Sequence, residues 1–141
     1  MARVLAVDPG TKHVGLALSD PTGTLATPLA PLPAAPRETL VERLAAAARE
    51  HEATRLIVGL PRNMDGSLGE AGRAARLLAQ QLQKASRLPV DLVDERLSSV
   101  AAERTLIGAG VRRARRKELA HGVAAALILE AWLQSEAGRS G

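Results

Sequence analysis

The pattern of apolar and polar residues near the amino terminus predicts three short strands. An aliphatic run at Arg3–Val7 stops at Asp8-Pro-Gly, as expected for a buried strand that ends in a turn. The apolar segments Val14–Ser19 and Thr24–Leu29 flank Asp20-Pro-Thr-Gly, a tetrapeptide rich in turn formers, which indicates a hairpin. The chain is therefore expected to begin with an antiparallel meander of three strands.

Helical spacing alternates with apolar runs over the rest of the chain. After a connection interrupted by several prolines, the predicted helices are Glu38–His51, Gly69–Ser86, Ser98–Ile107 and Glu118–Gln134, and the predicted strands are Arg55–Leu60 and Pro89–Val93. Crossovers of this kind are right-handed and make the later strands parallel. The order predicts an α/β fold with a mixed five-stranded sheet flanked by helices, in a single domain over residues 1–141.

The amino-acid composition excludes sites that depend on cysteine and gives no sign of secretion or membrane insertion. Cysteine is absent, which excludes thiolate zinc sites, disulfide bonds and a cysteine nucleophile. The apolar run before Asp8 is too short for a signal peptide, and no stretch approaches the roughly 20 apolar residues of a membrane span. We therefore expect a cytoplasmic protein without a membrane partner.

The net charge of +4 is concentrated in one short segment. Five basic residues lie between Val111 and Lys117, namely Arg112, Arg113, Arg115, Arg116 and Lys117. Such a run suits nucleic-acid phosphates, and the alternative is a solvated loop. Because Trp132 is the single aromatic residue, stacking of bases on aromatic side chains is disfavoured and contact with backbone phosphates is the expected mode.

Acidic residues follow two of the predicted parallel strands. Asp8 ends the first strand, and Asp94 and Glu95 end the fifth. Because the carboxyl ends of parallel strands meet at one edge of a sheet, these side chains are expected near one another. Carboxylate oxygens are the ligands that Mg²⁺ requires, and a pair of such ions activates water for phosphodiester hydrolysis. Each acid alone has a simpler interpretation, since Asp-Pro-Gly is a common turn.

Three segments in this order resemble the YqgF/RuvX family, with a match that spans nearly the whole chain. They are DPGTKHVGLALSD from Asp8, VGLPRNMDG from Val58 and VDERLSS from Val93, and the helix from Lys117 to Leu133 adds to the resemblance. Members are known as Holliday junction resolvases and pre-ribosomal-RNA nucleases, with the RNase H-like fold. The resemblance implies that Asp8 and Glu95 are the catalytic, metal-binding acids. Asp94 is a further candidate ligand because of its position at the end of the same strand as Glu95.

The chain departs from the family pattern at two histidines. His13 stands where the family usually has arginine, and a neutral imidazole supplies less charge toward a phosphate. His121 stands where the family usually has its third acid. If His121 is a metal ligand, the site favours Mn²⁺ over Mg²⁺. The alternatives are that His121 acts as a general acid/base, that it is a residue of the helix surface, or that the chain has lost its activity. Glu118, one turn earlier, is a possible substitute carboxylate.

Several residues near the predicted acids are candidates for phosphate contacts. Gly10 leaves room for close approach of a phosphate, and Asn63 follows the fourth strand. The remaining candidates are polar or charged: Thr11, Lys12, His13, Arg96, Arg112, Arg113, Arg115, Arg116 and Lys117. For Thr11 and Lys12 the alternative is ordinary solvation, and for Asn63 it is a simple turn.

Together these features predict a metal-dependent nuclease, a hydrolase acting on ester bonds in structured nucleic acid, with Mn²⁺ or Mg²⁺ as cofactor. The family resemblance implies the substrate, for which we expect the 5′ end of pre-16S rRNA. A Holliday junction resolvase is the alternative, and it requires a homodimer with two sites. An alternative from another functional class is a catalytically impaired protein that binds nucleic acid or the ribosome. A phosphotransferase is disfavoured because the chain has no phosphate-binding G-x-x-x-x-G-K-[ST] loop.

Overall fold

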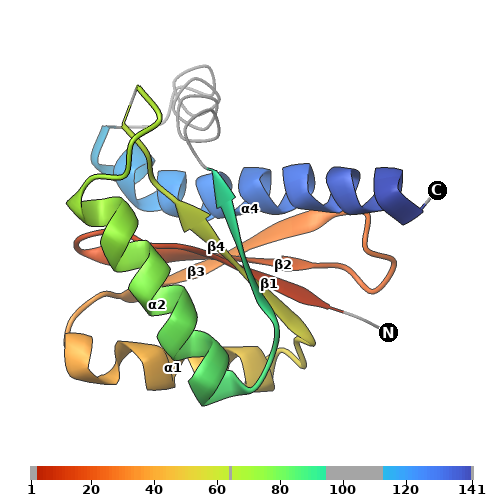
Figure 1. Cartoon of the computed structure of the whole chain (residues 1–141), viewed down its shortest axis with the longest axis horizontal. Coiled ribbons are helices and arrows are strands. Elements are labelled where there is room, and N and C mark those ends of the chain that lie inside the picture. The colour runs from red at the N-terminus through yellow and green to blue at the C-terminus, as the bar shows by residue number, and fades with distance from the viewer. Residues whose placement is uncertain (1–2, 64, 95–112, 141) are drawn as a thin grey trace.

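A computed structural model describes residues 3–63, 65–94 and 113–140 (Figure 1). The strands are β1 (Val4–Asp8), β2 (His13–Ser19), β3 (Ala26–Pro33), β4 (Arg55–Leu60) and β5 (Val90–Asp94), and the helices are α1 (Arg37–Glu50), α2 (Glu70–Ser86) and α4 (Arg113–Ser140). They confirm the predicted elements within a few residues at most ends. The helix expected at Ser98–Ile107 lies outside the described residues.

The strands form one mixed sheet in the order β3-β2-β1-β4-β5. The pairs β1–β2 and β2–β3 are antiparallel, whereas β1–β4 and β4–β5 are parallel. The predicted meander and parallel crossovers are therefore confirmed. The central position of β1 places its last residue, Asp8, in the middle of the sheet's edge.

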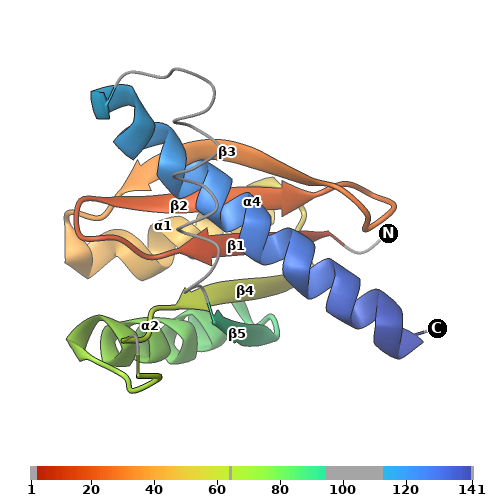
Figure 2. The ribbon, with the colours of Figure 1, turned by 90° about the horizontal axis from the view of Figure 1, so that it is seen from above.

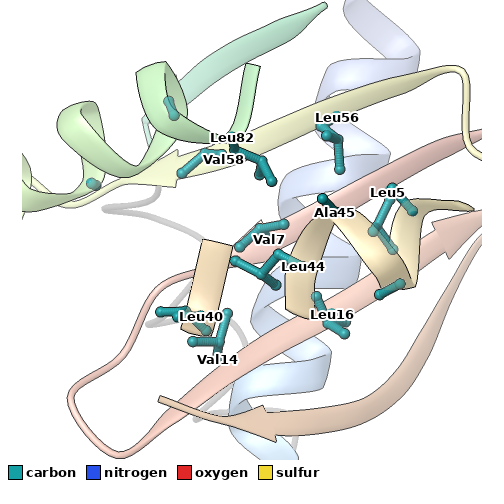
Figure 3. Close-up of a cluster of buried hydrophobic side chains, with 14 of the residues drawn as sticks. Leu5, Val7, Val14, Leu16, Leu40, Leu44, Ala45, Leu56, Val58 and Leu82 are labelled. Atoms are coloured by element: carbon teal, nitrogen blue, oxygen red, sulfur yellow. The ribbon is translucent and has the colours of Figure 1, made fainter. Parts of the chain in front are cut away.

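The sheet separates two apolar layers, because α1 and α2 cover one face and α4 crosses the other (Figures 1 and 2). Alternation along β1 sends Leu5 and Val7 to the first layer and Val4 and Ala6 to the second. In the first layer, leucines of both helices pack onto the sheet, as Leu40, Leu44, Leu82, Val14, Leu16 and Val58 show (Figure 3). Which layer a strand residue faces decides where each candidate acid lies.

Small residues bring α4 close to the sheet. Ala125 and Leu129 are fully buried against the strands. At Gly122 a β-carbon would lie 3.3 Å from Cβ of Pro28 and 3.5 Å from the carbonyl oxygen of Leu29, both in β3. The helix therefore begins its crossing in near contact with β3.

Two elements are longer than the sequence predicts. β3 continues to Pro33, past several prolines, because it is an edge strand and edge strands tolerate residues that cannot donate a ladder hydrogen bond. α4 begins at Arg113 instead of Glu118. The interpretation of the basic segment as a loop is therefore wrong from Arg113 onward, since arginine and lysine are good helix formers.

Candidate active site at the carboxyl edge of the sheet

Asp8 is the candidate acid that the structure places most clearly. It is the last residue of β1 and is only 5% exposed. Because Val7 faces α1 and α2, strand alternation directs Asp8 to the face that α4 crosses. A carboxylate that is removed from water needs hydrogen bonds or a cation to offset its lost hydration. Asp8 therefore lies at the strand end, as the sequence predicts, and it is more buried than an ordinary turn residue.

The ends of the three parallel strands lie level with one another. Val7 pairs with Val58 of β4, and the next residue of β4, Gly59, pairs with Val93 of β5. The residue after Val93 is Asp94, which pairs with Leu60 at the end of β4. The edge of the sheet is thus formed by the ends of β1, β4 and β5, as the sequence predicts.

Asp94 lies at this edge but belongs to the other face of the sheet. Val93 packs into the layer under α4, so alternation directs Asp94 toward the side of α1 and α2. There its Oδ2 forms an ion pair with Nε of Arg62 at 3.5 Å, and the side chains of Arg62 and Asp94 are 33% and 39% exposed. The structure therefore places Asp8 and Asp94 on opposite faces.

The loop between β4 and α2 is organised by Asn63. The Nδ2 amide of Asn63 donates to Oγ of Ser67 at 3.1 Å, and the backbone N–H of Asn63 donates to the Ser67 carbonyl at 2.9 Å. Arg62 donates from its guanidinium to the Gly66 carbonyl at 2.9 Å. In this arrangement Asn63 shapes the loop, and a direct phosphate contact stays a prediction.

Arg62 has a role that the sequence did not reveal, because its partner Asp94 follows it by more than thirty residues. The guanidinium links the β4–α2 loop to the end of β5. The one available signal was a cation two residues after the end of β4 and an acid at the end of β5. That signal becomes visible only when β4 and β5 are known to be adjacent.

The turn between β1 and β2 gathers four of the predicted substrate-binding residues beside Asp8. Gly10 is half-buried, and Thr11, Lys12 and His13 are exposed. The Lys12 carbonyl accepts a hydrogen bond of 2.9 Å from the backbone N–H of Ala34, which ties the turn to the end of β3. The turn therefore presents a cation and a hydroxyl from a fixed backbone.

The other predicted site residues lie on α4 or outside the described residues. Glu95, Arg96 and Arg112 lie outside the description. Arg113, Arg115, Arg116 and Lys117 lie in the first turns of α4, which start at the same end of the molecule as the β1–β2 turn (Figure 2). His121 lies on α4 directly before Gly122, where the helix approaches β3.

The described part of the site fits a hard divalent cation only in part. The buried carboxylate of Asp8 is an oxygen donor of the type that Mg²⁺ and Mn²⁺ bind. Among residues 3–63, 65–94 and 113–140, as far as they are described, no three acids or histidines lie close enough together to hold an ion. The described side chains thus offer one buried oxygen donor, that of Asp8, and no complete ligand set.

A pocket of about 340 Å³, which sequence reasoning missed, opens on the other side of the β1–β2 turn. It is lined by the turn together with Val14 of β2, by the first half of α1, and by one side of α2 together with Pro61 before it. Because the pocket is formed by three segments that lie far apart in the sequence, no local sequence pattern could predict it.

Within the described part of the chain, no helix is long and apolar enough to cross a membrane.

Comparison with known proteins finds similarity over nearly the full chain. The family described as "RuvX: Holliday junction resolvase" matches residues 2–135. A protein of Roseiflexus sp. (strain RS-1) is 39% identical over 134 residues, covering 95% of each chain. One of Myxococcus xanthus (strain DK1622) is 44% identical over 133 residues, covering 94% of this chain and 88% of the relative. Both carry the name "Putative pre-16S rRNA nuclease".

Solved structures share the fold at low sequence identity. Thermus thermophilus RuvC in complex with a Holliday junction substrate superposes with a TM-score of 0.64 at 17% identity, covering 98% of this chain and 97% of that one. The fowlpox virus Holliday junction resolvase superposes with a TM-score of 0.56 at 15% identity, covering 94% and 99%. These likenesses confirm the expected RNase H-like fold.

Proposed function

Because the chain belongs to the RuvX family, we propose that it is a divalent-metal-dependent nuclease that cleaves phosphodiester bonds in structured nucleic acid. The observation that carries the proposal is the buried carboxylate of Asp8 at the end of the central strand. A buried acid at the carboxyl edge of an α/β sheet stands where sites form in such folds.

Precursor ribosomal RNA is the substrate that we favour. The relatives at 39% and 44% identity are named for pre-16S rRNA, whereas the likeness to RuvC concerns the fold at 17% identity. We therefore propose a role in maturing the 5′ end of pre-16S rRNA. We propose a cytoplasmic location together with this role, on the basis of the relatives' names.

Asp8, Glu95 and His121 are the residues that we propose to hold the metal ions. When bound, divalent ions at such a site lower the pKa of the attacking water and offset charge on the leaving oxygen. Asp8 supports this role by its position and burial. Asp94 is a weaker candidate for the same ions, because strand alternation directs it to the opposite face and it pairs with Arg62.

The chain's own cations and hydroxyls would position the substrate backbone. Lys12 and Thr11 are exposed on the turn beside Asp8, and the basic first turns of α4 begin at the same end of the molecule. We propose that these groups, with His13, grip phosphates on either side of the cleaved bond. Contacts of this kind position a nucleic acid without reading its sequence.

Cleavage of four-way DNA junctions is the second candidate function. It is favoured by the family's description and by the fold shared with RuvC in its junction complex. Symmetric cleavage of a junction needs two sites, and therefore a homodimer. A strictly monomeric protein in solution would count against it.

One panel of substrates separates these functions. Cleavage is measured on precursor RNA that spans the 16S 5′ end, on single-stranded RNA and DNA, and on a four-way DNA junction, each with Mg²⁺ or Mn²⁺. We expect cleavage of the precursor RNA in preference to the junction. Preference for the junction would favour the second function. Binding without cleavage of any substrate would refute both nuclease functions and favour a catalytically impaired binding protein.

His121 makes the metal preference testable. We expect His121→Asp to raise cleavage with Mg²⁺ relative to Mn²⁺, since a carboxylate suits the harder ion better than imidazole does. Glu118→Gln tests the alternative carboxylate on the same helix, and we expect it to leave the ratio of Mg²⁺ to Mn²⁺ activity unchanged. An unchanged ratio of Mg²⁺ to Mn²⁺ activity in His121→Asp would remove His121 from the ligand set.

A further inference from the structure

The pocket of about 340 Å³ beside the β1–β2 turn lies against the candidate active site but contains none of its acids. Its walls are mainly aliphatic, with Leu40 and Val41 from α1 and Leu77 and Leu78 from α2. Leu77 is 53% exposed, so an apolar surface is left open to solvent at this point. Exposed leucine in a concave site is more informative than on a convex surface, because a ligand can cover it.

Polar groups are few and occur at defined positions of the pocket. Thr11 comes from the turn, and Gln81 comes from α2. Arg37, in the first turn of α1, is the one charged residue among the pocket's described lining, and its charge is positive. Apolar walls with a hydroxyl, an amide and a cation suit a planar heterocycle attached to a negative phosphate.

The pocket and Asp8 lie on the two faces of the same sheet edge. Val7 faces the layer of α1 and α2, and Asp8 faces α4. Pro9, Gly10 and Thr11 line the pocket and follow Asp8 directly, so Gly10 lies within about 7 Å of Asp8 along the chain. A nucleic-acid strand that crosses the turn can therefore contact both.

We propose that this pocket receives an unpaired nucleobase of the substrate strand, next to the phosphate that is cleaved. The inference rests on the proposed nuclease function and adds a position where the enzyme selects unpaired over paired nucleotides. Bases that leave a helix are recognised by burial of their faces and by hydrogen bonds at their edges. Aliphatic walls replace the aromatic platform that this chain lacks.

A nucleobase fits the pocket better than a protein partner does. The volume is at the lower end of the range of small-molecule sites, which begins near 300 Å³. A stable protein interface covers about 800 Å² on each partner, which is a much larger surface than this pocket offers. The positive charge of Arg37 also complements a nucleotide.

Filling the pocket tests the inference. Ala74 is an exposed residue of α2 that lines the pocket, so Ala74→Trp occupies the space without replacing a core side chain. Binding is measured in an Asp8→Asn background with precursor RNA that carries an abasic nucleotide at each position in turn. We expect one abasic position near the cut site to weaken binding by about tenfold, near the lower end of the loss for a base stacked on an aromatic ring, because the walls here are aliphatic.

The variant should abolish that preference. With Ala74→Trp, RNA with a base and RNA with the abasic nucleotide at the sensitive position should bind equally. Gln80→Trp is the matched control, since Gln80 is exposed on α2 and does not line the pocket. It should retain the tenfold difference. If Ala74→Trp lowers the melting temperature, Ala74→Leu gives the same comparison with a smaller side chain.

Three outcomes overturn the inference. The first is that no abasic position weakens binding, and the second is that Ala74→Trp keeps the full difference. The third is that Ala74→Trp changes the sedimentation mass and leaves the base preference intact, which would mark a protein interface. Cleavage of unmodified RNA by the wild-type chain is measured in parallel. Cleavage without base preference refutes the pocket assignment alone, whereas absence of both cleavage and binding refutes the nuclease proposal as well.

Discussion

Asp20 organises the hairpin between β2 and β3 through its side chain. Its carboxylate accepts hydrogen bonds from the backbone N–H groups of Leu25 at 2.9 Å and Thr24 at 2.8 Å, and from the hydroxyl of Thr22. These bonds stabilise the ionised form, with the Leu25 N–H and the Thr22 hydroxyl contributing most, and lower the pKa of Asp20 from 3.8 to about 2. The turn that the sequence predicts from Asp-Pro-Thr-Gly is therefore also an acid-sensitive one.

The lowered pKa gives a pH-dependent stability. Because the folded-state pKa lies below the unfolded value, the contribution of Asp20 is present above pH 3.8 and is lost as the pH falls toward 2. We expect wild type to melt at a higher temperature than Asp20→Asn at pH 6, and we expect the gap to shrink between pH 4 and pH 2. Thermal melts by circular dichroism measure the gap. A gap that is constant across this range would contradict the assignment.

Individual site residues differ in how far the sequence could place them. Asp8 was predictable, because an aliphatic strand followed by Asp-Pro-Gly fixes both the strand end and the acid. The face of Asp94 was not, since a shift of one residue in the pairing register moves a side chain to the other side of the sheet. The Arg62–Asp94 pair was also hidden, because it depends on which strands are neighbours.

At the scale of elements, the start of α2 is held against the loop that leads into it. A β-carbon at Gly72 would lie 2.7 Å from the carbonyl oxygen of Pro61 and 2.9 Å from Cδ2 of Leu68. Backbone cannot move away as a flexible side chain can. The absence of a side chain at Gly72 therefore sets the distance between α2 and the end of β4.

We expect Gly72→Ala to destabilise the fold by roughly 1–3 kcal/mol, since the added methyl group overpacks a close backbone contact. Urea denaturation measures the free energy of unfolding. Gly69→Ala is the control three residues earlier, where the nearest atom is the side-chain oxygen of Asn63 at 3.4 Å. Equal losses in the two variants would contradict a specific contact at Gly72.

The first turns of α4 give a prediction about salt dependence. If Arg115 and Arg116 contact phosphates, replacing both by alanine should weaken binding to all nucleic acids alike. The slope of log Kd against log salt concentration should fall by about one for each lost contact. Fluorescence anisotropy with labelled RNA at several salt concentrations measures it. A slope identical to that of wild type would show that these arginines do not contact phosphate.

The limits of elements were harder to predict than their order. β3 passes through Pro28 and Pro33 because it is the outermost strand of the sheet that the described residues form, and the sequence does not reveal which strands are edges. Likewise, the basic segment before Glu118 has no apolar periodicity, so no amphipathic pattern predicts a helix there. Its helical state is favoured by the high helix propensity of arginine and lysine.

For the whole molecule, the sequence was sufficient for the class of sheet and insufficient for the strand order and the surface. A hairpin meander and right-handed crossovers predict a mixed sheet but leave several strand orders open, and the structure supplies the order. The pocket between the β1–β2 turn, α1 and α2 is a property of packing, and its lining comes from three distant segments. The sheet thus carries an acid on one face of its edge and an apolar pocket on the other.

The central claim is that a metal-dependent nuclease site is built around Asp8, and cleavage of precursor RNA in saturating Mn²⁺ tests it most directly. We expect Asp8→Asn and Glu95→Gln each to lose about 100-fold or more in rate, as expected when a group that stabilises transition-state charge is removed. Asp91→Asn is the control, since Asp91 lies on β5 away from the edge and pairs with Arg55. Near-wild-type cleavage by both Asp8→Asn and Glu95→Gln would contradict the claim.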